Sequence, residues 1–127
     1  MIEEINTVIK EEGNNIGFHF PRKLRVGARN INVKPKTMLS KVYNNADTVT
    51  ERYRHRYSFN LNYKQLYEES GLVFSSFNND DGECTQETLE LPNHRFFVGV
   101  QYHPELISTP FNPHPLITEF LKAAIAK

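Results

Sequence analysis

The chain has 127 residues, the length of a single domain that can bury about two thirds of its unfolded surface. Its 15 basic residues balance its 15 acidic residues, so no net field favours nucleic acid or an anionic membrane as a partner. No apolar run approaches the roughly 18 residues that a membrane-spanning helix needs. A single cysteine, Cys84, allows no internal disulfide and predicts a reducing compartment, so we expect a cytoplasmic protein.

Residues 1–22 give the weakest structural signal. Apolar side chains recur at helical spacing from Ile2 to Ile9, and Gly13 interrupts the pattern, which is typical of a short helix. This segment is left without an assigned domain. Residues 23–127 predict one domain in which helices and strands are mixed.

The first half of that domain alternates between strand and helix patterns. Residues 23–27 predict a strand that runs into a turn at Gly27, and residues 38–43 predict a short helix. Residues 49–59 have the period of two that is typical of a strand, with one aromatic and one cationic face. The cationic face comprises Arg52, Arg54 and Arg56.

The middle of the domain predicts a helix, a hairpin and a buried strand. Asn62 is expected to cap a helix that ends at Gly71. Residues 72–91 predict a β-hairpin, because an Asp-Gly pair separates two strand patterns. The run 96–102 is apolar on both faces, which is typical of a strand in the middle of a covered sheet.

The last pattern is an amphipathic helix over residues 115–126. Its expected inner face consists of Leu116, Ile117, Phe120, Leu121 and Ala124. Short connections between mixed elements favour an α/β domain of two or three layers with several antiparallel strands.

The His-Pro-Glu sequence that follows the apolar run is the strongest chemical signal. Residues two apart on an extended segment project to the same side, so His103 and Glu105 are expected to meet. A glutamate that accepts from one imidazole nitrogen fixes the tautomer and leaves the other nitrogen as a general base. The alternative is a histidine at a strand end that caps a turn, and the three residues alone favour that alternative.

The surrounding residues favour the catalytic role of His103 over the turn cap, because they resemble a known family. Gly-Val-Gln-Tyr-His-Pro-Glu at residues 99–105 is similar to the His-Pro-Glu segment of class I glutamine amidotransferases. Glu-Arg-Tyr-Arg-His-Arg-Tyr at residues 51–57, with Asn60 following, narrows the resemblance to the amidotransferase domain of the CTP synthase family. Similar segments occur in the same order at residues 92–98, 108–110 and 113–116.

The resemblance implies the C-terminal part of a flavodoxin-like, three-layer α/β domain that hydrolyses glutamine. In that family the ammonia passes to a synthetase domain, which aminates UTP to CTP with ATP and Mg²⁺ in pyrimidine synthesis. His103 and Glu105 match the catalytic histidine and glutamate, and Arg56 matches the arginine that holds the α-carboxylate of glutamine. Arg52, Arg54 and His55 are expected to be ordinary charges on a strand face. We expect neither a cofactor nor a metal site in this chain.

The chain also departs from the family. In the family, the nucleophilic cysteine lies on a Gly-x-Cys-x-Gly turn, and this sequence does not contain that pattern. The family's glycine-rich oxyanion loop is also missing from this sequence. Cys84 is expected to be an incidental thiol, and the chain alone is expected to be inactive. The chain is interpreted as a gene fragment, the product of a split gene or a degenerate copy of such a domain. Two alternatives stay open. They are a catalytically dead module that docks on an intact CTP synthase or another partner, and half of a site that a separate amidotransferase half completes in trans.

Overall fold

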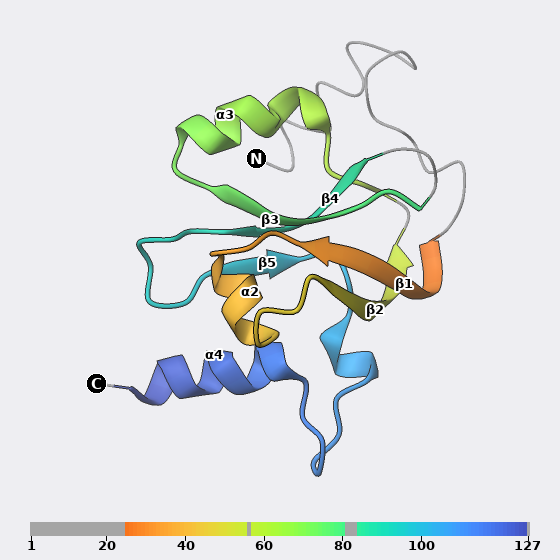
Figure 1. Ribbon diagram of the computed structural model, residues 1–127, viewed down its shortest axis with the longest axis vertical. Helices are drawn as coiled ribbons and strands as arrows, with labels where there is room; N and C mark the ends of the chain where they lie inside the picture. Colours follow the sequence, from red (N-terminus) through yellow and green to blue (C-terminus); the bar gives the residue numbers. More distant parts are fainter. Residues whose placement is uncertain (1–24, 56, 81–83, 127) are drawn as a thin grey trace.

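The computed structural model describes residues 25–55, 57–80 and 84–126, and Figure 1 shows their arrangement. They form a five-stranded sheet in the order β2-β1-β3-β4-β5, in which every neighbouring pair is antiparallel. The strands are β1 (Arg25–Val33), β2 (Thr48–His55), β3 (Val73–Asn78), β4 (Thr85–Glu90) and β5 (Val98–Val100). The predicted α/β class with antiparallel strands is confirmed.

Helices cover the sheet on two sides, which gives three layers. Figure 1 shows the α-helix α3 (Lys64–Glu69) above the sheet, and α2 (Met38–Val42) and α4 (Pro115–Ile125) below it. Two 3₁₀ turns, η2 (Leu61–Tyr63) and η3 (Pro104–Leu106), lie in the connections. No helix among the described residues combines the length and the apolar character that a membrane span needs.

The hydrophobic core lies between the sheet and the α2 and α4 layer. Its buried members are Ile31, Val33, Leu39, Val42, Tyr53, Tyr102 and Leu116. Ile31 and Val33 of β1 belong to this core, whereas Asn32 between them lies on the opposite face, because alternate side chains of a strand lie on opposite faces. The same alternation buries Glu51 and Tyr53 on β2 and exposes Arg52 and Arg54, as the period of two predicted.

The short helix α2 is held in place by two different caps. The side chain of Thr37 accepts a hydrogen bond from the Ser40 amide at 3.0 Å. The carboxylate of Glu90 on β4 accepts from the amides of Met38 at 2.7 Å and Leu39 at 3.1 Å. These amides have no partner within the helix, so the buried glutamate satisfies them and ties α2 to the sheet.

Two local predictions were wrong in detail. The strand that was expected to turn at Gly27 continues as β1 to Val33, because glycine tolerates its φ of 94° within the strand. The helix turn after β2 is capped by Asn60 and not by Asn62. The Asn60 side chain accepts from the Asn62 amide at 3.0 Å, so the cap lies two residues earlier than the pattern suggested.

Two expected core surfaces are partly open. β5 was expected in the middle of the sheet, but it pairs only with β4 in the described part of the chain, and Phe97 before it is 44% exposed. On α4 only Leu116 is buried, whereas Phe120 is 52% and Leu121 is 55% exposed. An apolar pattern predicts that a face is buried, but it does not predict which segment packs against it.

Candidate functional site

The segment after β5 bridges two distant strands of the sheet. The Gln101 amide donates to the carbonyl of Glu87 on β4 at 3.0 Å, and the His103 amide donates to the carbonyl of Arg52 on β2 at 2.9 Å. Because β4 and β2 are not neighbours in the strand order, the sheet must curl for one segment to reach both. This curl brings His103 beside the end of β2.

His103 and Glu105 are in direct contact. Nδ1 of His103 lies 2.6 Å from Oε1 of Glu105, and the two side chains are 40% and 61% exposed. A carboxylate can only accept, so the imidazole proton lies on Nδ1 and the Nε2 lone pair stays available. The hydrogen bond from His103 holds the pKa of the Glu105 carboxyl below its usual value.

The predicted contact between these two side chains is confirmed. His103 also occupies the N-cap position of η3, where its carbonyl accepts from the Leu106 amide at 3.1 Å, but its side chain makes no capping hydrogen bond. The catalytic role of the pair stays a prediction.

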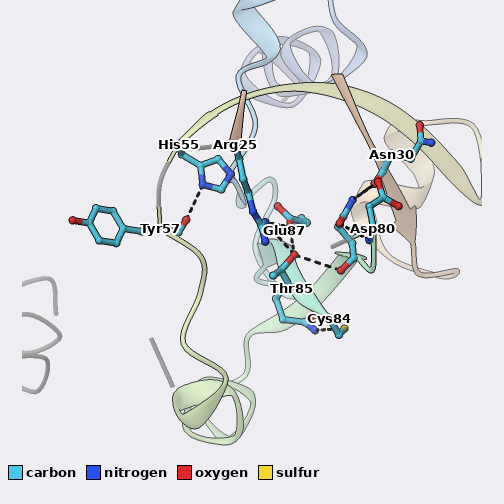
Figure 2. A network of polar contacts seen from close by, with 10 residues as sticks. Arg25, Asn30, His55, Tyr57, Asp80, Cys84, Thr85 and Glu87 are labelled. Atoms are coloured by element: carbon cyan, nitrogen blue, oxygen red, sulfur yellow. Dashed lines mark hydrogen bonds and ion pairs between the residues drawn. The ribbon is translucent and has the colours of Figure 1, made fainter. Parts of the chain in front are cut away.

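The residue that is predicted to bind the substrate is not among the described residues. Arg56 lies outside the described residues, so its binding role remains a prediction. Next to it, His55 is half-buried, and its Nδ1 lies 2.7 Å from the carbonyl oxygen of Tyr57, as Figure 2 shows. Burial lowers the pKa of His55, which favours the neutral imidazole. His55 therefore serves the local backbone, while Arg52 and Arg54 are exposed strand-face charges.

Cys84 does not meet His103. The thiol is exposed just before β4, and within the described residues its hydrogen-bond contact is with Nε2 of Gln86 at 3.8 Å (Figure 2). A nucleophile needs its base within hydrogen-bond reach, and no hydrogen bond joins Cys84 to His103 in the described part of the chain. That Cys84 is incidental stays a prediction that this placement supports.

An internal ion pair behind the site was not anticipated from the sequence. Nη1 of Arg25 lies 3.1 Å from Oε1 of Glu87 and 3.2 Å from Oγ1 of Thr85, and Thr85 also donates to the Glu87 carboxylate (Figure 2). Glu87 falls where the β3–β4 register shifts, between Ser76↔Thr88 and Phe77↔Gln86. Such a bulge re-aims a side chain, and here it turns a glutamate into the curled sheet toward β1.

An open groove lies beside β5, on the side of the sheet that α3 covers in part. Its volume is about 270 Å³, and besides aromatic, aliphatic and amide groups its lining contains Glu87 and Thr88. Its lining includes Phe59, Phe74, Leu89, Phe97, Gly99 and Gln101. Among the described residues there is no group of three His, Cys, Asp or Glu side chains that could hold a metal ion.

Sequence comparison agrees with this geometry. The model of the glutamine amidotransferase class-I family matches residues 7–123. A CTP synthase of Sinorhizobium medicae is 46% identical over 102 residues, which cover 80% of this chain and 18% of that relative. A CTP synthase of Agrobacterium fabrum shows the same identity and coverage, and one of a Chelativorans species is 43% identical over 102 residues. The chain therefore spans 18% of the length of these relatives.

Structure comparison shows a matching fold. The glutaminase domain of a Trypanosoma brucei CTPS, solved with bound acivicin, superposes with a TM-score of 0.75 and 35% sequence identity. The superposed region covers 80% of this chain and 40% of that glutaminase domain chain. The described fold is thus similar to part of a glutaminase domain.

Proposed function

The chain belongs to the class I glutamine amidotransferase family, and we propose that it supplies the histidine and glutamate of a glutaminase site of the CTP synthase type. The observation that carries this proposal is the contact of 2.6 Å between His103 Nδ1 and Glu105 Oε1. Identity of 46% to CTP synthases supports it. So does the similarity to a glutaminase domain bound to acivicin, a glutamine analogue.

Glu105 and His103 would act as one acid–base unit. The carboxylate holds the proton on Nδ1, so Nε2 can take the proton from a thiol as its sulfur attacks the carboxamide carbon of glutamine. The same nitrogen can then return the proton to the leaving nitrogen, which departs as ammonia and leaves a thioester that water hydrolyses to glutamate. Exposure of His103 at 40% leaves its ring accessible to such a substrate.

Substrate recognition and the use of the ammonia extend the proposal further. Arg56 is proposed to bind the α-carboxylate of glutamine, because a guanidinium fork matches a carboxylate. In a longer protein of this kind, the ammonia would aminate UTP to CTP at a synthetase domain that uses ATP and Mg²⁺. These whole-protein steps rest on relatives of which the chain covers only 18%.

The chain alone is proposed to be inactive toward glutamine. Its only cysteine is Cys84, which is exposed and makes no hydrogen bond to His103 among the described residues. Without a positioned thiolate the thioester cannot form. Loss of one oxyanion donor alone typically removes about 3 kcal/mol of transition-state stabilisation, and the glycine-rich loop that would supply such donors is missing.

The exposed apolar surface distinguishes the two remaining alternatives. An independent binding module would be expected to carry polar side chains along its sheet edge. Instead, Phe97 beside β5 is 44% exposed and lines the open groove, and Phe120 on α4 is 52% exposed. Apolar surface of this kind usually marks an interface, so it favours a site that further polypeptide completes over a self-sufficient, catalytically dead module.

Ammonia release from glutamine tests the proposal. We expect none from the 127-residue chain. We expect release when it is mixed with the remaining, cysteine-containing part of a glutaminase domain from the Sinorhizobium medicae CTP synthase, and none when the chain carries His103→Ala. Release that persists in His103→Ala would overturn the assigned role of the histidine. Failure of well-folded parts to give any release on mixing would favour the dead module.

A further inference from the structure

A buried polar network centred on Glu51 lies behind the His103 segment. Glu51 on β2 is 2% exposed, and His114 at the start of α4 is 3% exposed. Oε1 of Glu51 lies 2.6 Å from Nε2 of His114 and 2.6 Å from the hydroxyl of Tyr43. The Tyr43 hydroxyl lies 2.7 Å from that of Tyr102. One carboxylate thus joins β2, α2, α4 and the segment after β5.

The donors in this network can be assigned from its geometry. The Leu116 amide donates to Nδ1 of His114 at 3.0 Å, so Nδ1 holds a lone pair and the proton lies on Nε2, facing Glu51. Burial raises the pKa of Tyr43 far above its usual range, so its hydroxyl keeps its proton and donates it to Glu51. The Tyr102 hydroxyl must then donate to Tyr43. The hydrogen bonds therefore run from both sides toward Glu51.

The network reaches both ends of the segment that carries the proposed catalytic pair. Tyr102 directly precedes His103, so the Tyr43–Tyr102 contact fixes the upstream end. At the downstream end, the backbone amide of His114 donates to Oγ of Ser108 at 3.0 Å, just after η3. The His103 amide is also held by the carbonyl of Arg52, the residue next to Glu51.

We propose that Glu51 is a positioning residue, whose carboxylate holds the Tyr102–Ser108 segment through Tyr43 on one side and His114 on the other and so sets the orientation of His103 toward Glu105. This inference rests on the proposed function, because it assigns a role within the same site. It also explains the Ser-Thr-Pro and Pro-His-Pro segments at residues 108–110 and 113–115, to which no chemistry was assigned. Ser108 and His114 are the residues that anchor the segment.

The tautomer of His103 is the readout that separates positioning from general stabilisation. Long-range ¹H–¹⁵N correlation NMR on the full chain distinguishes the Nδ1–H from the Nε2–H form of a neutral imidazole and gives their ratio. The measurement is made at a pH of about 8, above the reference histidine value of about 6.5. Wild-type protein should show mainly Nδ1–H, as the contact with Glu105 requires. Glu51→Gln and the milder Tyr43→Phe should each lower this ratio by about fivefold, the effect of one typical hydrogen bond.

Two controls alter buried polar groups that make no hydrogen bond to Glu51, Tyr43 or His114 in the described part of the chain. Glu90→Gln alters another glutamate that is 2% exposed and binds backbone amides of α2, and Tyr53→Phe removes the hydroxyl of a tyrosine that is 1% exposed. Both should leave the His103 ratio at its wild-type value even if they lower stability. An unchanged ratio in Tyr43→Phe, or an equal fall in the two controls, would overturn the proposal. Glutamine is not used, so this outcome is independent of the ammonia-release test.

Discussion

The backbone amide of His103 donates to the carbonyl oxygen of Arg52 across 2.9 Å. This bond joins the segment after β5 to the strand β2, although the two lie at opposite ends of the strand order. Arg52 lies on the same stretch of chain as Arg56, the residue proposed to bind the substrate. The proposed base is therefore hydrogen-bonded to the strand that precedes, in the sequence, the arginine proposed to bind the carboxylate.

Glutamine should bind weakly to the chain near these segments. We expect millimolar affinity at best, about 4 kcal/mol, because much of the pocket would belong to polypeptide that the chain lacks. Titration by NMR should shift signals of Arg56 and His103, and Arg56→Ala should abolish the shifts. Arg54→Ala is the matched control, since Arg54 is an exposed arginine of β2 and should not matter. No shifts at saturating glutamine would exclude a residual pocket.

Glu105 should titrate below its ordinary pKa of 4.5, because it accepts a hydrogen bond from His103. A carboxyl whose pKa is lowered in the folded state stabilises the fold above the unfolded pKa, and this contribution is lost as the pH falls through the folded value. In His103→Ala the Glu105 pKa should return toward 4.5 when carboxyl carbon shifts are followed against pH. An unchanged Glu105 curve would contradict the contact.

Phe97→Ala should destabilise the chain less than Leu39→Ala. Leu39 is fully buried in the core, and such a truncation typically costs about 2–5 kcal/mol. Phe97 is 44% exposed, so its truncation should cost roughly half of the 3–5 kcal/mol of a fully buried phenylalanine. Urea unfolding measures both. Equal losses of unfolding free energy in the two variants would mean that Phe97 is buried in solution. A urea midpoint that depends on protein concentration would show that a second copy of the chain buries it.

Glu90→Gln should lower the free energy of unfolding by about 1.5–3 kcal/mol, the usual contribution of hydrogen bonds to a charged group. The reason is that this buried carboxylate accepts from two amides at the start of α2. Glu119→Gln is the control, because Glu119 forms only an exposed ion pair with Lys122 and should contribute under about 1 kcal/mol. Equal effects in thermal or urea unfolding would show that the cap on α2 is unimportant.

Cys84→Ala should leave both the fold and any reconstituted ammonia release unchanged. The thiol is exposed, and Gln86 is its hydrogen-bond partner among the described residues. Circular dichroism checks the fold, and the mixing assay with the cysteine-containing part of a glutaminase domain checks the activity. Release that disappears in Cys84→Ala would identify this thiol as the nucleophile and would require a rearrangement of the segment before β4.

Contacts between residues that are close in the sequence could be predicted from the sequence alone. The contact between His103 and Glu105 was expected from their spacing of two, although Pro104 and Glu105 lie in the turn η3 and not on an extended segment. At the start of α2, Thr37 caps the first turn from the neighbouring position. In each case the interacting groups lie within three residues of each other, so the local geometry of a turn or of a helix start is enough to bring them together.

Long-range features were decided by the packing of the whole chain. Glu51 and His114 are 63 residues apart, and no pattern in the sequence predicts that they are in contact. The register shift that turns Glu87 toward Arg25 depends on how β3 and β4 pair, and the open position of β5 depends on which strands are present beside it. The periodicity of the sequence indicates which face of a helix or strand is apolar. Which segment packs against that face depends on all the other segments of the chain, so the pairing is known only from the folded sheet.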